Sequence, residues 1–276
     1  MTNAPASFEV LRTDVPRGAI RHALFDFDGT LSLIREGWQG VMVPLMVRVL
    51  AATPAAEPPE AIEALVRAYV DRTTGIQTIY QMMGLTDMVR ERGGEPLPAT
   101  AYKQQYLDEL WERIKGRVAG LKAGSIPRED LMVPGAEQVL TSLAERGVRC
   151  YLASGTDLEY VRDEVTALGL ADYFDGHIYG AVADLGAFSK AMVIEAILRD
   201  NDLHGHELVT FGDGYVEIEE TVAVGGLTVG VASDEVGRSG RVDPWKRERL
   251  AEAGAHIIVA DFGHVGALLD YLFATD

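Results

Sequence analysis

The sequence predicts an α/β fold in which a parallel sheet is interrupted by a helical insert. The first observation is the order along the chain, where short apolar runs alternate with stretches of helical periodicity, as in βαβ units. The second is that this alternation stops over a long internal stretch that has helical periodicity but no convincing strand. The third is composition: 47% of the 276 residues are hydrophobic and 24% are charged, which is typical of a folded protein with a sizeable core.

The sheet-forming part of the chain is expected to contain six strands and four crossover helices. Apolar, β-rich runs predict the strands at 23–27, 149–153, 177–179, 208–211, 227–231 and 256–259. Apolar residues recur three and four positions apart in the predicted helices, at 135–146, 158–168, 190–199 and 216–224. Residues 1–18 are expected to form a loose or edge-packed leader.

The insert is predicted to be entirely helical, with its own small core. Helical periodicity covers 41–50, 61–69, 76–83 and 102–114, and two loops rich in Pro and Gly separate these segments. We therefore expect a sheet domain of residues 1–32 and 128–276 and a helical domain of residues 33–127. The insert either closes as a lid or serves only stability. Its polar segment Arg72–Gln77 either contacts a substrate or places Thr73 or Thr74 at a helix N-cap.

Charge and cysteine content exclude several classes of function. Lys and Arg total 25 against 42 for Asp and Glu, so the formal net charge is −17 and nucleic acid is not an expected partner. The single cysteine, Cys150, excludes an intrachain disulfide, which fits a reducing compartment, so a cytoplasmic location is expected. No apolar run is long enough to span a membrane, and the N-terminus lacks a signal-peptide pattern.

Polar motifs follow several predicted strands at their carboxyl ends, where open parallel sheets carry their functional side chains. DFDGT at Asp26–Thr30 follows the first strand, Ser154–Thr156 follows the second, and Gly212–Glu217 follows the fourth. Lys190 opens a helix between the third and fourth strands. Each alone has an ordinary explanation as a turn, a cap or a surface charge. Together they would bring carboxylates, a hydroxyl and an ammonium group to one edge of the sheet.

This combination of groups suits the transfer of a phosphoryl group, which needs a nucleophile, a proton carrier and positive charge on the phosphoryl oxygens. Carboxylates alone would repel phosphate, whereas Mg²⁺ binds one or two carboxylates together with a substrate oxygen. Asp26, Asp213 and Glu217 are the expected ligands. Lys190 would hold the phosphate as a point charge, and the Ser154 hydroxyl would donate to its oxygens.

In their order and spacing, DFDGT, Ser154, Lys190 and the Gly-Asp-x-x-x-Glu of GDGYVE resemble the four motifs of the haloacid dehalogenase superfamily. The helical insert lies between the first two motifs, similar to members with a type 1 cap. The resemblance therefore implies a Rossmann-like parallel sheet core with an inserted all-helical cap domain. Two departures are Glu217, where Asp is more usual, and the uncommon sequence Leu31–Arg35 after the first motif.

The resemblance also implies roles for individual residues. Asp26 would be the nucleophile that forms an aspartyl-phosphate, and Asp28 would be the general acid and base and a metal ligand through its backbone carbonyl. The remaining implied residues bind phosphate or metal: Thr30, Ser154, Gly155 and Lys190 the phosphoryl group, and Asp213 and Glu217, with Asp26, the Mg²⁺ ion.

We therefore expect a Mg²⁺-dependent phosphatase that hydrolyses a small phosphorylated metabolite, such as a sugar phosphate. A dehalogenase is disfavoured, because release of a halide needs no proton and Asp28 has the place of a proton carrier. Two alternatives stay open at this point, a phosphosugar mutase of the same superfamily and a module that binds a phosphorylated ligand without turnover. The sequence predicts neither the identity of the substrate nor the oligomeric state.

Overall fold

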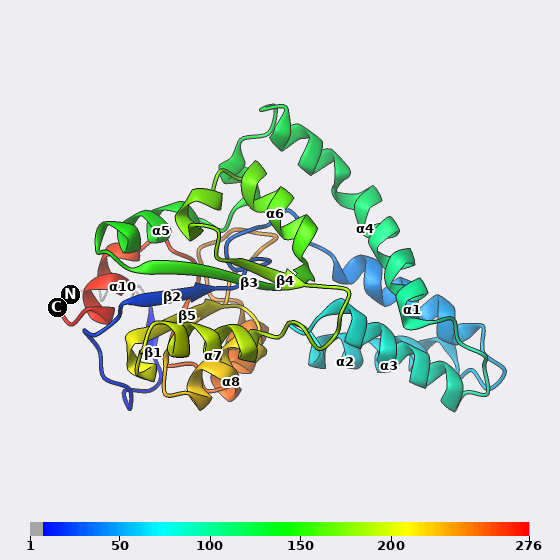
Figure 1. Cartoon of the computed structure of the whole chain (residues 1–276). Helices are drawn as coiled ribbons and strands as arrows, with labels where there is room; N and C mark the ends of the chain where they lie inside the picture. Colours follow the sequence, from blue (N-terminus) through cyan, green and yellow to red (C-terminus); the bar gives the residue numbers. More distant parts are fainter. Residues whose placement is uncertain (1–7, 276) are drawn as a thin grey trace, which may run out of the picture. The chain divides into compact units, whose positions relative to one another are not determined.

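The computed structural model describes residues 8–275 and has the predicted fold class, a Rossmann-like sheet core with a helical insert (Figure 1). The chain folds as two compact units. The sheet unit takes in the chain up to Ile34 and again from Gly120 onward, and the helical unit is Arg35–Ala119. Residues 33–34 and 120–127, which were predicted to belong to the insert, thus group with the sheet unit.

Within residues 8–275 a single sheet of seven strands has the order β1-β7-β6-β5-β2-β3-β4. Every neighbouring pair is parallel except β1 and β7, which are antiparallel. The strands are β1 (Glu9–Val10), β2 (His22–Phe25), β3 (Arg149–Asp157), β4 (Ile178–Ala181), β5 (Leu208–Gly212), β6 (Leu227–Val231) and β7 (Ile257–Val259).

Strand β2 lies in the middle of the sheet, between β5 and β3, and this placement brings the motif loops together. In the register of the sheet, Phe25 at the end of β2 is level with Phe211 on β5 and Leu152 on β3. All four residues of β2 are buried, as expected for a strand covered on both faces. The chain segments that follow these three parallel strands therefore leave the sheet side by side at its carboxyl edge.

Helices cover both faces of the sheet, as in a doubly wound fold. Figure 1 shows α5 (Ala136–Glu145) and α6 (Leu158–Ala167) on one face and α7 (Lys190–Asp200) and α8 (Tyr215–Ala223) on the other. Helix α9 (Pro244–Glu252) packs beside α8 and against β6. Helix α10 (Val265–Leu272) ends the described chain. At the centre of the core, the buried rings of Phe25 and Phe211 stack with their centroids 4.6 Å apart.

The helical unit contains α1 (Gln39–Ala51), α2 (Pro59–Arg72), α3 (Thr78–Glu91) and α4 (Ala99–Lys122), the last of which runs past the boundary of the unit. The hydroxyl of Thr73 donates to the carbonyl of Tyr69 (2.8 Å), and that of Thr74 donates to the carbonyl of Val70 (2.9 Å). Both threonines therefore bond back to the end of α2. The predicted N-cap role is wrong, because Gln77 is the N-cap of α3.

Three details of the sheet unit differ from the sequence analysis. Strand β2 ends at Phe25, two residues early, because the chain turns directly into the motif loop. Strand β3 continues four residues beyond Ala153, with a shift in its register with β4, so that Ser154 lies within the strand. Helices α9 and α10 were not predicted, and β1 is an edge strand within the leader expected at 1–18, of which residues 1–7 lie outside the described residues. In the described part of the chain, no helix combines the length and the apolarity needed to cross a membrane.

Candidate active site

The loop after β2 carries Asp26 and Asp28. Phe25 and Phe27 are fully buried, and alternation of side chains along the extended chain places Asp26 and Asp28 together on the other side. The chain then turns tightly at Gly29, which has a φ of +77°. Hydrogen bonds fix this turn, because the backbone N–H groups of residues 30, 31 and 32 all donate to the carbonyl oxygen of Phe27, with N–O distances of 3.3, 2.9 and 2.9 Å.

Lys190 connects Asp26 to Glu217 at the centre of the site. Its Nζ lies 2.9 Å from Oδ1 of Asp26 and 2.7 Å from Oε2 of Glu217, and all three side chains are buried. Lys190 is the first residue of α7, whose N-cap Ser189 accepts the N–H of Met192. The start of α7 therefore fixes the position of the ammonium group at the carboxyl edge of the sheet.

Glu217 is held by the turn that connects β5 to α8. Its Oε1 accepts the backbone N–H of Gly214 at 2.8 Å, while its Oε2 accepts from Lys190. A Cβ atom on Gly212 would lie only 2.1 Å from this Oε1, so the carboxylate packs directly on glycine backbone. Glu217 is thus placed as a partner of Lys190. A carboxylate has four acceptor positions, so it keeps capacity for a further ligand.

Asp28 is anchored to β3 through hydroxyl groups. Its Oδ2 accepts the hydroxyl of Thr156 at 2.8 Å and lies 3.4 Å from the hydroxyl oxygen of Ser154. The Ser154 oxygen in turn accepts the backbone N–H of Thr156 (3.1 Å), and Gly155 lies between these two residues. No role was predicted for Thr156. It could have been found as the next hydroxyl after Ser154, on the same side of an extended strand.

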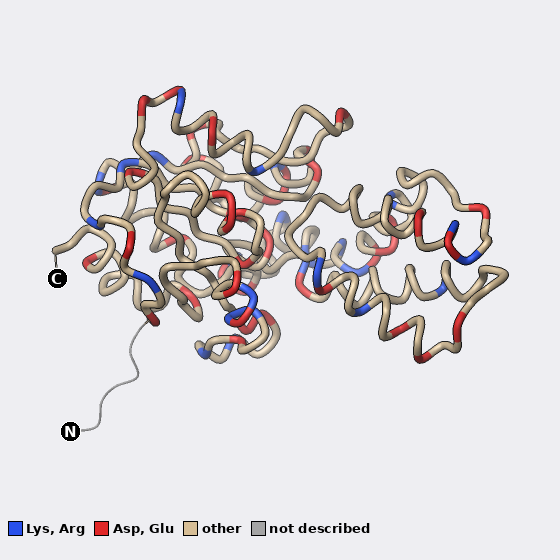
Figure 2. The backbone as a smooth tube through the Cα atoms, turned by 90° about the horizontal axis from the view of Figure 1, so that it is seen from below, with Lys and Arg blue, Asp and Glu red and all other residues tan. Residues whose placement is uncertain are grey.

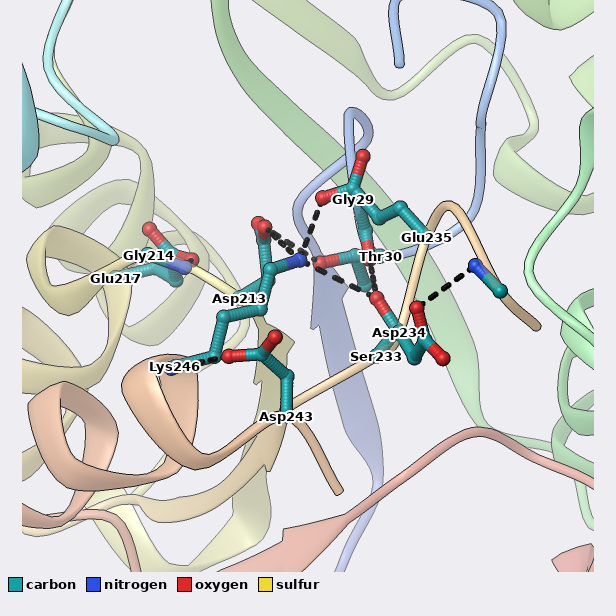
Figure 3. Close-up of polar contacts among 11 residues, drawn as sticks. Gly29, Thr30, Asp213, Gly214, Glu217, Ser233, Asp234, Glu235, Asp243 and Lys246 are labelled. Carbon is teal, nitrogen blue, oxygen red and sulfur yellow. Dashed lines mark hydrogen bonds and ion pairs between the residues drawn. The ribbon is translucent and has the colours of Figure 1, made fainter. Parts of the chain in front are cut away.

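Asp213 follows β5 and meets two residues from other parts of the chain (Figure 3). Its Oδ2 accepts from Nζ of Lys246 at 2.8 Å, and its Oδ1 lies 3.5 Å from the hydroxyl of Thr30, which is fully buried. Thr30 was expected to bind the phosphoryl group, and the structure places its hydroxyl against the Asp213 carboxylate. A Cβ atom on Gly29 would lie 2.2 Å from Oδ2 of Asp213, which shows how closely the two loops approach.

Lys246 extends the site beyond the residues that the sequence indicated. Besides Asp213, its Nζ contacts Oε1 of Glu235 at 2.6 Å and the hydroxyl of Ser233 at 3.2 Å (Figure 3). Ser233 and Glu235 follow β6, so the rule that directed attention to strand ends could have found them. Lys246 carried no such signal, because it lies in the charged run WKRER, which is typical of a solvated helix face.

Burial and mutual repulsion control the ionisation of this cluster. Burial raises the pKa of Asp26, and the nearby carboxylates of Glu217 and Asp213 raise it further, although Lys190 opposes them. Burial likewise raises the pKa of Glu235 against the opposing charge of Lys246. For Lys190 and Lys246, burial acts to lower the pKa, but the surrounding carboxylates raise it, so both ammonium groups are charged.

The donor set fits a hard divalent cation. One carboxylate oxygen from each of Asp26, Asp213 and Glu217 lies within 4.8 Å of the others, so three of the four expected metal residues meet at one point. Among the described residues, this group of carboxylates does not include the side chain of Asp28. Asp28 was expected to bind the metal through its backbone carbonyl. The cluster has more carboxylates (Asp26, Asp28, Asp213, Glu217 and Glu235) than ammonium groups (Lys190 and Lys246), and an all-oxygen donor set is the kind that Mg²⁺ prefers.

The chain belongs to the haloacid dehalogenase-like hydrolases, since the model of this family matches residues 20–225. Solved structures share the fold at low sequence identity, and their described activities include both a phosphatase and mutases. A β-phosphoglucomutase from Clostridium difficile aligns with a TM-score of 0.61 at 14% identity, over 93% of this chain and 98% of its own.

Two further solved structures cover nearly the whole chain. A predicted phosphoglycolate phosphatase from Haemophilus somnus 129pt has a TM-score of 0.60 at 14% identity, over 91% of this chain and 98% of its own. A family hydrolase from Deinococcus radiodurans R1, solved with bound phosphate and sodium, has a TM-score of 0.55 at 18% identity, over 92% and 97%. No curated protein matches the sequence.

Proposed function

We propose that the protein is a Mg²⁺-dependent phosphatase that hydrolyses a small phosphorylated metabolite through an aspartyl-phosphate on Asp26. The observation that carries this proposal is the convergence of Asp26, Lys190, Asp213 and Glu217 in one buried cluster at the carboxyl edge of the sheet. Family membership supports the same reaction class. The expected phosphate-binding groups are Thr30, Ser154, Gly155 and Lys190.

In the first step, a carboxylate oxygen of Asp26 attacks phosphorus, and the bond between phosphorus and the leaving oxygen breaks. Asp28 donates a proton to that oxygen, so that the dephosphorylated part of the substrate leaves as a neutral alcohol. Its contacts with the hydroxyl groups of Thr156 and Ser154 hold the Asp28 carboxyl group in place. Lys190, charged and in contact with Asp26, would offset negative charge on the phosphoryl oxygens.

In the second step, Asp28 is a carboxylate and removes a proton from water as the water oxygen attacks phosphorus. The acyl-phosphate bond breaks, which releases inorganic phosphate and regenerates the Asp26 carboxylate. The proposed metal ligands are Asp26, Asp213 and the backbone carbonyl of Asp28, with Glu217 as a further ligand or as the partner that positions Lys190. When bound, Mg²⁺ would neutralise charge on the nucleophile and on the phosphoryl group.

Release of phosphate from p-nitrophenyl phosphate tests this proposal. We expect turnover that requires Mg²⁺, stops with a chelator and falls to background in Asp26→Asn, because an amide is a poor nucleophile. As a matched control, Asp163→Asn changes an exposed aspartate on α6 that pairs with Lys122, and it should leave activity unchanged. Full activity in Asp26→Asn, or turnover that is insensitive to metal removal, would exclude this mechanism.

A small phosphorylated metabolite such as a sugar phosphate is the proposed substrate class, and a screen of phosphorylated metabolites against the purified protein would identify it. A mutase would use the same catalytic residues but would isomerise a phosphosugar and release little phosphate. A coupled assay for phosphate and for isomerised sugar therefore distinguishes the two, and tight binding without turnover would indicate a binding module.

A further inference from the structure

The segment from β6 to α9 brings a second lysine into the acidic cluster. After β6 the chain forms a loop that is closed at its base by the bridge between Ser233 and Val242, and the N–H of Asp243 then bonds to the carbonyl of Ala232 at 2.8 Å. Asp243 is the N-cap of α9, and its side chain accepts the N–H of Lys246 at 2.9 Å. The cap thus fixes the backbone of Lys246 in the first turn of the helix.

Lys246 is unfavourable by local rules. It lies in the first turn of α9, where the helix dipole disfavours a positive charge, and its side chain is only 9% exposed, so the ammonium group is removed from water. The carboxylates of Asp213 and Glu235 and the hydroxyl of Ser233 surround it and offset this cost. A residue that contradicts local preference while meeting several partners at once is expected at functional sites.

The contacts of Lys246 connect three loops of the site. Glu235 and Ser233 hold its Nζ from the β6 loop, and the Ser233 hydroxyl donates to the carbonyl of Gly29 at 2.9 Å (Figure 3). From this position Nζ binds Oδ2 of Asp213, whereas Oδ1 of Asp213 lies on the side of Thr30. The carboxylate therefore cannot rotate freely, because each of its two oxygens has a defined neighbour.

We propose that Lys246, held by Glu235 and Ser233, is a positioning residue that orients the Asp213 carboxylate toward the bound cation. Partners that hold a ligating carboxylate in place typically change metal affinity by about 10- to 100-fold when they are removed. The inference rests on the proposed Mg²⁺-dependent function. It assigns to the β6 loop and α9 a part in the site that none of the four sequence motifs covers.

Direct binding of Mn²⁺ to the substrate-free protein, measured by electron paramagnetic resonance of the free ion, tests the inference. We expect Lys246→Met to weaken Mn²⁺ binding by about 10- to 100-fold. The Mg²⁺ concentration for half-maximal activity should rise by the same factor. Arg247→Met is the matched control, because it removes one positive charge from the same helix at an exposed pair with Glu9, and it should change neither value.

Two further variants separate orientation from simple charge. The double variant Lys246→Met/Glu235→Gln removes one positive and one negative charge, so the net charge of the site is unchanged. The side chain at position 235 is then neutral and needs no counter-ion. We expect it to bind Mn²⁺ about as weakly as Lys246→Met. Glu235→Gln alone keeps the contact between Lys246 and Asp213, so we expect a smaller loss of affinity than in either variant that lacks the lysine.

Three results would overturn the inference. Tighter Mn²⁺ binding in Lys246→Met would mean that the lysine competes with the cation. Wild-type Mn²⁺ affinity in folded Lys246→Met, or in the folded double variant, would mean that Lys246 serves stability alone. Unfolding curves recorded for each variant establish whether that variant is folded. If instead the wild-type protein binds no Mn²⁺, and Asp213→Asn changes nothing, the proposed function itself fails and the inference fails with it.

Discussion

At the scale of single residues, the site depends on close approach between loops, and Gly29 lies at one of these points. Its φ of +77° disfavours any side chain, and a Cβ atom there would lie 2.2 Å from Oδ2 of Asp213 and 3.1 Å from Oε1 of Glu235. The glycine is therefore needed both for the turn and for the space that the Asp213 carboxylate occupies.

We predict that Gly29→Ala lowers the free energy of unfolding by about 1 to 3 kcal/mol and weakens Mn²⁺ binding, because Asp213 must move. Chemical denaturation and Mn²⁺ titration measure the two effects. Gly147→Ala is the matched control, since Gly147 also has a positive φ (+73°) but a Cβ atom there would meet nothing within 4 Å. It should lose stability through backbone strain while keeping Mn²⁺ affinity. Equal Mn²⁺ affinity in the two variants would contradict this prediction.

The sequence was most informative for residues that lie in ordered motifs. Asp26, Lys190, Asp213 and Glu217 were all placed at one sheet edge from strand-end reasoning, and the structure brings them together. Thr156 and Lys246 were not found, for different reasons. Thr156 lies in the part of β3 that extends beyond the apolar run from which the strand was predicted. Lys246 reaches the site from α9, whose sequence is typical of a solvent-exposed helix.

At the scale of elements, β2 begins with a buried titratable group. His22 is only 6% exposed, its Nδ1 lies 3.1 Å from the hydroxyl of Tyr151, and its ring stacks on that of Tyr151. Burial lowers the pKa of His22 to about 4, and the positive charges of Arg149 and Arg21 contribute, although Glu207 opposes them. The folded protein therefore favours the neutral imidazole at the start of its central strand.

This depressed pKa predicts a loss of stability in acid. As the pH falls through about 6.5, the histidine of the unfolded chain takes up a proton that the folded chain does not accept until about pH 4. The free energy of unfolding should therefore fall between these values, and by less in His22→Gln, which cannot titrate. Denaturation curves at pH 7 and pH 5 measure the difference. His264→Gln changes an exposed histidine and should behave as the wild type. The same pH dependence in His22→Gln and wild type would exclude this role.

Elements with strong periodicity were predicted closely, and short ones were missed. The central parallel strands are buried on both faces and appear in the sequence as continuous apolar runs. Helix α9 escaped prediction because it is nine residues long and mostly charged, with only Lys246 and Leu250 buried. Strand β1 has two residues and exists only by pairing with β7, a long-range contact that no local pattern reports.

At the scale of the whole molecule, the proposed function requires an acidic protein to accept an anionic substrate. The formal net charge is −17, and acidic residues occur along both units of the chain (Figure 2). A phosphate group can bind only where the local electrostatic potential is positive. In the proposed site, Lys190 and a divalent cation on Asp26 and Asp213 would provide this positive potential. The division into a sheet unit and a helical unit followed from the interrupted alternation of strands and helices, whereas residues 120–127 carried no clear boundary signal.

Asp26 is the proposed nucleophile, and trapping of its aspartyl-phosphate tests this role most directly. The protein would be mixed with Mg²⁺ and p-nitrophenyl phosphate, quenched in acid and digested, and its peptides weighed by mass spectrometry. We predict one added phosphoryl group on Asp26 in the wild type. The adduct should be more abundant in Asp28→Asn, where hydrolysis of the aspartyl-phosphate lacks its base, and absent from Asp26→Asn. Two results would contradict the proposed role of Asp26, provided that the wild type releases phosphate. One is the absence of the adduct in Asp28→Asn, and the other is an adduct on a different residue.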